Sequence, residues 1–128
     1  MFNTIKTSKV NKERVSLLTR KLNLGAENII ARLALAYSVA GERKLDLADV
    51  SDSQGKEYSY KVLFGEYGEF YMAMLCVHYN LHISDKDLVR YVKMHVDDGL
   101  ELLDQEFQKS SSSGVEFLIQ KINHGLQK

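Results

Sequence analysis

Residues 8–40 read SKVNKERVSLLTRKLNLGAENIIARLALAYSVA, and this stretch decides the fold class. Ser8 can cap a first helix, Lys9–Leu22, with its hydroxyl, and Gly25 can take the left-handed conformation that ends a helix. A second helix, Ala26–Ala40, follows. In both helices apolar side chains recur at three- and four-residue steps, as on a buried helix face. They are Val15, Leu18 and Leu22, then Ile29, Ile30, Leu33, Ala36, Tyr37 and Ala40.

The composition extends this helical class to the rest of the chain. The 128 residues include no proline, and 45% of them are hydrophobic, which is enough for one compact core and short for two. We therefore predict an all-α protein, a compact bundle of about four to five helices, as a single domain over residues 1–108. The serine-rich residues 109–114 have the composition of a flexible linker. Residues 115–128 are predicted to form an amphipathic helix with the stripe Val115, Leu118, Ile119, Ile122 and Leu126.

Two more helices are predicted in the second half of the chain. Glu66–Tyr79 is an apolar run typical of a mostly buried helix, with Phe70 and Val77 on its stripe. Ser84 is the expected cap of the next helix, whose Gly99 allows a neighbouring helix to approach closely. Together these helices carry more apolar surface than one small core hides, so we expect a homo-oligomer.

Two segments are expected to be non-helical. The β-branched residues of Phe2–Thr7 favour a short extended segment, and the polar residues 42–65 form a connection that includes an extended piece over Tyr58–Phe64. An extended segment followed by a basic helix and an apolar helix is typical of ribbon-helix-helix DNA binders. We therefore expect an N-terminal part of that kind.

The residues that could carry chemistry do not form a recognised catalytic or metal motif. His78 and His82 lie four residues apart, as zinc ligands on one helix do, but no acid or cysteine stands at a spacing that completes a site. Cys76 lies in an apolar run and is expected in the core. Gly65–Gly68 carries an acid where a phosphate-binding loop requires free amides and a lysine. We expect no enzyme activity, no cofactor and no metal.

The sequence also bears on location. No stretch reaches the length of about 18 uncharged apolar residues that a membrane span requires, and the first seven residues lack the apolar run of a signal peptide. A single cysteine agrees with a reducing compartment. We expect a cytoplasmic protein that does not contact a membrane.

A formal net charge of zero hides a polarity along the chain. Residues 1–44 contain nine Lys or Arg against three Glu, a net charge of +6, so that residues 45–128 carry −6. Such a molecule can present a cationic face to a polyanion while an anionic flank avoids it. The same charges can instead scatter over a solvated surface that has no partner. Both interpretations stay open on charge alone.

Helical periodicity gathers three cations of the first predicted helix. At 100° per residue, Lys9, Lys12 and Arg20 share the side opposite the apolar stripe. Arg14 and Lys21 fall on one row at the edge of that stripe, where long side chains can cover apolar surface. These two residues either contact DNA or pack at a subunit boundary. With the preceding Lys6, the predicted DNA-binding residues are Lys6, Lys9, Lys12, Arg14, Arg20 and Lys21.

Three groups of residues, in order and spacing, resemble the DndE family of DNA sulfur modification proteins. Arg20–Leu24 leads into a helix that contains Ala31–Ala34, as in the first part of that family. Phe64–Tyr67 running into Tyr71–Leu75 is similar to the family's middle helix, and His95–Leu100 is similar to its later helix with His and Gly. The resemblance covers roughly residues 7–105. None of these motifs is a catalytic signature, and residues 110–128 look like an extension.

The resemblance implies a small, mostly helical protein that assembles as a homotetramer and binds duplex DNA, with a preference for nicked duplex. It implies partners as well: a cysteine desulfurase, an iron-sulfur protein, a sulfur-transferring protein and an ATPase, which together replace a non-bridging phosphate oxygen by sulfur. Two alternatives stay open. A ribbon-helix-helix transcription regulator would read bases with alternate residues of Phe2–Thr7, and an assembly adaptor would bind partner proteins and no DNA.

Overall fold

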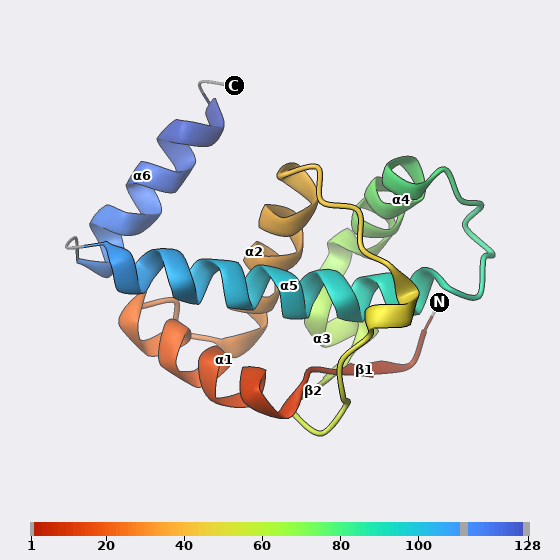
Figure 1. Cartoon of the computed structure of the whole chain (residues 1–128), viewed down its shortest axis with the longest axis horizontal. Helices are drawn as coiled ribbons and strands as arrows, with labels where there is room; N and C mark the ends of the chain where they lie inside the picture. Colours follow the sequence, from red (N-terminus) through yellow and green to blue (C-terminus); the bar gives the residue numbers. More distant parts are fainter. Residues whose placement is uncertain (1, 111–112, 127–128) are drawn as a thin grey trace.

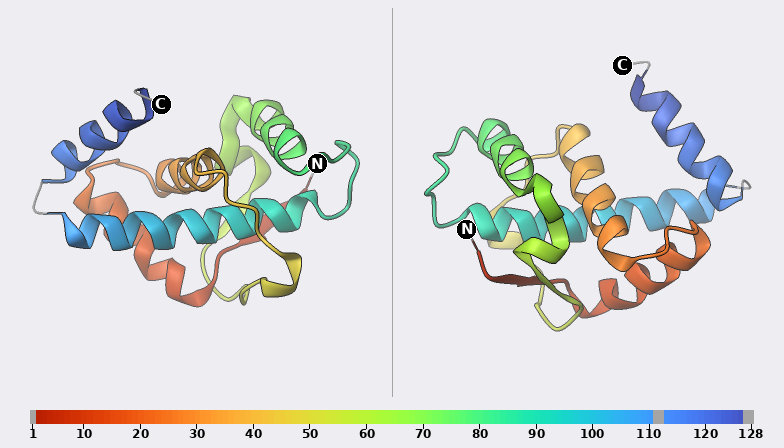
Figure 2. Two further views of the ribbon diagram at one scale, coloured as in Figure 1. Left: turned by 45° about the horizontal axis from the view of Figure 1, so that its top comes forward. Right: turned by 180° about the vertical axis from the view of Figure 1, so that it is seen from behind.

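The protein is mostly helical with a small two-stranded sheet, in a computed structural model that describes residues 2–110 and 113–126 (Figure 1). The all-α class is confirmed in this coarse form, and the sheet is the departure from it. The long helix α5, Leu88–Lys109, runs along the molecule. One side of α5, the β1–α1 side, carries β1 (Thr4–Lys6) and α1 (Lys9–Lys21). The opposite side, the α4–α6 side, carries α4 (Gly68–Tyr79) and α6 (Gly114–Leu126), and α2 (Glu27–Ala40) crosses α5 from the end of α1 towards that side (Figure 2).

The core forms where α5 crosses α2. Val96 and Leu100 of α5 and Leu35 of α2 are fully buried there. A Cβ atom placed on Gly99 would lie 1.8 Å from the carbonyl oxygen of Ala34, so this helix spacing requires glycine. The prediction that Gly99 admits a neighbouring helix is confirmed, and the neighbour is α2 of the same chain.

Helix α1 begins where the sequence predicts. The Ser8 hydroxyl accepts a hydrogen bond from the backbone N–H of Asn11 at 3.3 Å. This bond satisfies an N–H that has no partner within the helix. After the helix, Asn23 and Gly25 both have positive φ, 56° and 84°, a region that these two residue types tolerate best. This turn brings α2 back against the buried stripe of α1, which includes Val15 and Leu18.

The strand β1 pairs antiparallel with β2, Glu57–Ser59, and places Ile5 opposite Tyr58. Both of these side chains are buried, and the Tyr58 hydroxyl donates to the carbonyl oxygen of Glu27 at 3.0 Å. The predicted extended segment near the N-terminus therefore exists, and its strand partner comes from the same chain.

The extended piece predicted over Tyr58–Phe64 is wrong beyond Ser59. The Ser59 hydroxyl accepts from the N–H of Val62 at 3.2 Å and caps a short helix, α3 (Tyr60–Phe64). A 3-10 turn, η2 (Gly65–Tyr67), connects this helix to α4, and another, η1 (Leu47–Asp49), lies in the earlier connection. Serine capping and the burial of Phe64 outweigh the β-propensity of this aromatic stretch.

Helix α4 is less buried than predicted. Met72 and Leu75 face the core, whereas Phe70 is 70% exposed and Val77 is 83% exposed. The predicted buried stripe through Phe70 and Val77 is wrong, because α4 packs through the neighbouring row of side chains. The helix is apolar on both rows, so that periodicity alone does not identify its inner face.

Helix α5 begins later than predicted. Ser84 does not cap it, because its hydroxyl lies 2.8 Å from Nδ1 of the His82 ring. Asp87 holds the N-cap position without a side-chain cap bond, and α5 starts at Leu88. The prediction of Ser84 as N-cap is therefore wrong, while the helix itself is present.

Helix α6 packs on the far end of α5. Phe117 is buried, with its ring centroid 5.2 Å from that of Phe107. A Cβ atom on Gly114 would lie 2.0 Å from the carbonyl oxygen of Lys21, so the start of α6 contacts the end of α1. More than half of the surface of three apolar side chains is nevertheless exposed, namely Val115, Ile119 and Ile122. Ser111 and Ser112 of the predicted linker, residues 127–128 and the side chain of Leu126 lie outside the described residues.

Candidate nucleic-acid interface

A buried carboxylate of α5 fixes the orientation of α1. Oδ1 of Asp97 accepts from Nδ2 of Asn11 at 2.7 Å and from the backbone N–H of Ser8 at 3.0 Å. Its Oδ2 accepts from Nζ of Lys93 at 2.6 Å and from the Ser51 hydroxyl at 2.9 Å. A buried charge pair requires such complete hydrogen bonding. The network therefore determines which side of α1 faces outward.

The outward side of α1 carries the predicted cations. Lys9, Lys12 and Arg20 are exposed, and none of them forms an ion pair with a described residue. Lys6 on β1 and Lys21 at the end of α1 are likewise exposed, with no ion pair to the described part of the chain. These five residues, the cationic strip, present uncompensated positive charge along consecutive elements of the β1–α1 side.

Arg14 lies elsewhere. It is half-buried, and its Nε donates to Oδ2 of Asp104 at 3.1 Å while Nη1 donates to Oδ1 of Asn11 at 3.0 Å. A guanidinium that is shared between two acceptors retains fewer donors for a phosphate. The sequence leaves two roles open for Arg14, DNA contact and packing at a boundary. The contacts of Arg14 favour packing, and the boundary lies between α1 and α5 of one chain.

Carboxylates interrupt the cationic strip. Glu13 is exposed, and helical spacing places it on the same side as Lys9 and Arg20. Asp52 accepts the backbone N–H of Lys9 at 2.8 Å, and its hydrogen bonds to backbone N–H groups lower the pKa of its carboxyl group. Glu13 was not predicted at this site, although the periodicity that groups Lys9 with Arg20 also locates it.

A second polar cluster is buried between α2, α4 and α5. The Ser38 hydroxyl donates to Oδ2 of Asp98 at 2.6 Å, so its oxygen accepts from Nδ1–H of His95 at 2.7 Å. Nε2 of His95 then accepts from the Tyr79 hydroxyl, whose oxygen accepts the N–H of Leu45 at 3.0 Å. Burial lowers the pKa of His95 to about 4, and the ring is neutral at pH 7. The sequence predicts no polar role for His95, whose partners come from other elements of the fold.

The two histidines considered as zinc ligands have different partners. Nε2 of His78 lies 2.6 Å from the carbonyl oxygen of Arg43, whereas the ring of His82 bonds the hydroxyl of Ser84. Among the residues that the structure describes, no three His, Cys, Asp or Glu side chains lie close enough to hold a metal ion. Cys76 is half-buried beside the core. None of the described helices is both long and apolar enough to span a membrane.

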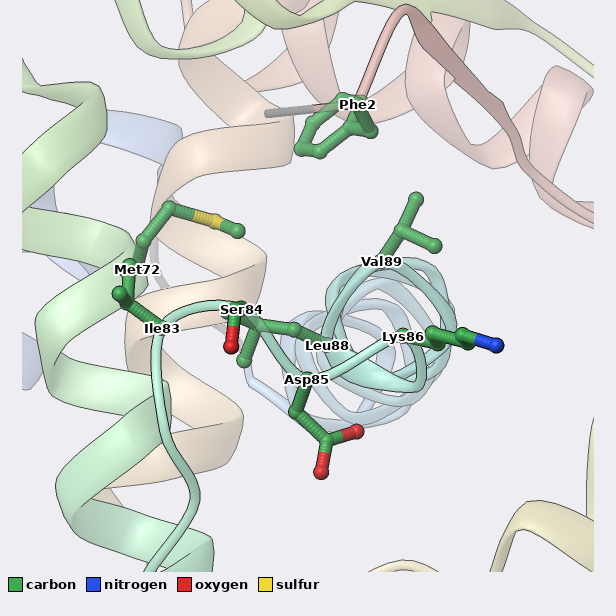
Figure 3. A pocket seen from close by; sticks show the side chains of 8 residues that line it. All are labelled: Phe2, Met72, Ile83, Ser84, Asp85, Lys86, Leu88 and Val89. Atoms are coloured by element: carbon green, nitrogen blue, oxygen red, sulfur yellow. The ribbon is translucent and has the colours of Figure 1, made fainter.

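A hollow lies between the N-terminal segment and the loop before α5 (Figure 3). Phe2, Met72 and Val89 surround it, while the side chains of Asp85 and Lys86 point away from it. The hollow therefore offers apolar contacts and not a paired acid and base.

The fold and the cationic strip define a small helical protein with a cationic strand and helix on one side. A family model described as "DNA sulphur modification protein DndE" matches residues 4–111, and the chain belongs to the DndE family. The resemblance expected from the sequence is confirmed. Helix α6 lies beyond the matched residues.

Two solved structures of DndE proteins share this fold. DndE from Escherichia coli B7A, described as involved in DNA phosphorothioation modification, has a TM-score of 0.64 and 23% identity, and the match covers 80% of this chain and 98% of that chain. A DndE mutant with two glycines replaced by lysine, described as involved in DNA phosphorothioation, has a TM-score of 0.66 and 22% identity, with coverage of 80% and 97%. The comparison with curated proteins gives no match.

Proposed function

We propose that this chain is the non-catalytic DNA-binding subunit of a DNA phosphorothioation system and holds duplex DNA on its β1–α1 side. One observation carries the proposal: the exposed and unpaired cationic strip, in a member of a DNA sulphur modification family. Lysine and arginine side chains that neutralise phosphates release condensed counterions, and this release supplies most of the sequence-independent affinity for DNA.

A non-catalytic role agrees with the contacts of the buried ionisable groups. Asp97 and His95 are both buried and hydrogen-bonded within the chain, and they hold helices together. The sulfur chemistry then belongs to other subunits of the system. We include a preference for nicked duplex, which the family resemblance implies, as part of this proposal.

We also propose that the chain assembles as a homotetramer through its α4–α6 side. Phe70 and Val77 on α4 and Ile119 on α6 are large apolar side chains that the single chain leaves exposed. Phe70 and Val77 lie seven residues apart on one row of α4, and exposed apolar side chains that gather on one face typically mark a protein interface.

The regulator alternative requires the segment Phe2–Thr7 to read bases. Ile5 and Thr7 are buried, and the ring of Phe2 lies 5.0 Å from that of Tyr60. Asn3, Thr4 and Lys6 remain exposed, but the alternating face that would enter a groove retains only Thr4 and Lys6, because Phe2 packs on Tyr60. Two side chains on that face suit backbone contact better than base recognition, so this observation favours the phosphorothioation subunit. The adaptor alternative has support in the exposed apolar residues of α4 and α6, and the following experiment separates it from DNA binding.

The proposal is tested by titrating fluorescent duplex, nicked duplex and single-stranded DNA with the protein at several salt concentrations. Four phosphate contacts predict a slope of log affinity against log salt of about −3.6, and a loss on the order of a hundredfold between about 50 and 200 mM. Lys12→Ala with Arg20→Ala should flatten the slope by roughly two and weaken all duplex sequences alike. The matched control, Lys61→Ala with Lys109→Ala, removes the same charge elsewhere. Unchanged binding by the first variant, or no DNA binding at low salt, contradicts the proposal.

A further inference from the structure

A shallow hollow lies between the uncovered edge of β1 and the first turns of α5. Its lining combines hydroxyl groups, cations and two apolar side chains and contains no carboxylate, and the lining residues are Thr4, Ile5, Lys6, Ser53, Val89, Arg90 and Lys93. We call this site the β1 hollow. A phosphate requires hydrogen-bond donors and positive charge, and both are present in it.

Two of the three cations of the β1 hollow are available to a ligand. Lys6 is exposed and forms no ion pair with a described residue, including Glu57, which lies opposite it in β2. The side chain of Arg90 is half exposed, and it forms an exposed ion pair of 3.3 Å from Nη1 to the Asp87 carboxylate that leaves its other N–H groups available. Lys93 is held by Asp97 and by the carbonyl oxygen of Asp52, so it belongs to the floor of the hollow.

The backbone of β1 adds donors on the same edge. The N–H of Thr7 donates to Lys56, and the N–H of Tyr60 donates to Asn3, so that alternate residues of β1 bond to β2. The N–H groups of Thr4 and Lys6 therefore point to the edge that β2 does not cover. The carbonyl groups of Thr4 and Lys6 lie on the same edge and do not favour an anion. The positive side chains that line the hollow therefore decide that its net charge favours a phosphate.

A second hollow, beside α1, differs from the β1 hollow in the charge of its lining. Several carboxylates line it, including those of Asp46, Asp49, Asp98 and Glu101, and they outnumber its two cations, Arg14 and Lys44. A polyanion is repelled from that hollow and attracted to the β1 hollow.

We propose that the β1 hollow binds one backbone phosphate of the DNA that lies on α1, with Lys6 and Arg90 as its charged donors. This inference rests on the proposed function and adds a contact from α5 to it. Lys9 to Arg20 span about 16 Å at 1.5 Å per residue. The segment from Lys6 to Lys9 adds up to about 10 Å. Together these lengths reach at most about 26 Å, which is less than one turn of duplex, about 34 Å, so that one duplex segment can contact the whole strip.

The test measures duplex affinity and its salt dependence for Lys6→Ala with Arg90→Ala in the full-length protein. Loss of two phosphate contacts should flatten the slope by about 1.8 and weaken binding at low salt on the order of tenfold. A second pair of variants probes the hollow itself. Ser53→Asp places a carboxylate in its lining and should weaken binding, whereas Gln54→Glu adds the same charge at the next exposed residue, outside the lining, and should have a smaller effect.

The outcomes separate this inference from the proposed function. If Lys12→Ala with Arg20→Ala weakens binding while the Lys6 and Arg90 pair does not, the β1 hollow is not a phosphate site and α1 still binds DNA. Equal effects of Ser53→Asp and Gln54→Glu also overturn the site, because net charge alone then explains the loss. If the wild-type protein binds no DNA, both the hollow and the proposed function fail.

Discussion

The two sides of α5 differ in the side chains that they expose to solvent and in the buried polar contacts that hold them to α5. The β1–α1 side exposes lysine and arginine and is anchored by a charged cluster around Asp97 and Lys93. The α4–α6 side exposes Phe70 and Val77 and is anchored by a hydrogen-bonded cluster around the neutral ring of His95. Exposed charge suits a polyanion, whereas exposed apolar surface suits another protein. In the proposed function, DNA therefore lies on the β1–α1 side and subunit assembly uses the α4–α6 side.

The largest expected effect is dissociation of the oligomer after substitutions on the α4–α6 side. Phe70→Glu with Val77→Glu places charges on the exposed row of α4, and we expect the mass in solution to fall from that of a tetramer to that of one chain. The fold should persist because neither side chain is in the core. Light scattering measures the mass. Val10→Glu, which changes an exposed valine of α1, is the matched control and should leave the mass unchanged. A wild-type protein that is already monomeric would remove the argument for the α4–α6 side.

A smaller effect concerns the cluster around His95 that holds the α4–α6 side. The folded-state pKa of His95 is about 4, below the ordinary value near 6.5, so the unfolded chain binds an extra proton between these values. Stability from this residue is complete above pH 6.5 and falls as the pH drops towards 4, by a total of about 3 kcal/mol. Urea unfolding at pH 7, 5.5 and 4.5 should show this decline. His95→Gln should flatten it, and an equal decline in the variant would contradict the assignment.

The smallest expected effect is a change in DNA affinity after a substitution on the β1–α1 side. Glu13→Gln removes the exposed carboxylate that shares a side with Lys9 and Arg20, and duplex affinity should rise on the order of threefold at low salt because repulsion of phosphate is lost. Glu69→Gln, an equivalent change on α4, should leave DNA affinity unchanged. Fluorescence anisotropy measures both variants. If Glu13→Gln and Glu69→Gln behave alike, α1 does not face the DNA.

The sequence predicts the two sides unequally well. The β1–α1 side follows local rules: Ser8 caps α1, Gly25 turns the chain, and the 3.6-residue period separates Lys12 from Val15. The buried anchor of α1 was not predicted, since Asn11 and Asp97 are far apart in sequence and their contact depends on the tertiary fold.

The α4–α6 side illustrates the limit of periodicity. Helix α4 has apolar residues on two rows, and the fold buries Met72 while it exposes Val77. The start of α5 shows a similar limit: Ser84 and Asp87 are both plausible caps by type, and the contact of Ser84 with His82 decides between them. A competing local hydrogen bond is not visible in a residue-type pattern.

The most direct test of the central claim measures the chemical reactivity of each lysine, with and without duplex DNA, by acetylation and mass spectrometry. Exposed lysines also occur outside the β1–α1 side, with Lys61 on α3 and Lys109 at the end of α5, so that one experiment compares this side with other parts of the surface. We predict that DNA protects Lys6, Lys9, Lys12 and Lys21 and leaves the exposed Lys61 and Lys109 as reactive as in the free protein. Protection of Lys61 and Lys109 with unchanged reactivity at Lys9 and Lys12 would contradict the assignment of DNA to the β1–α1 side.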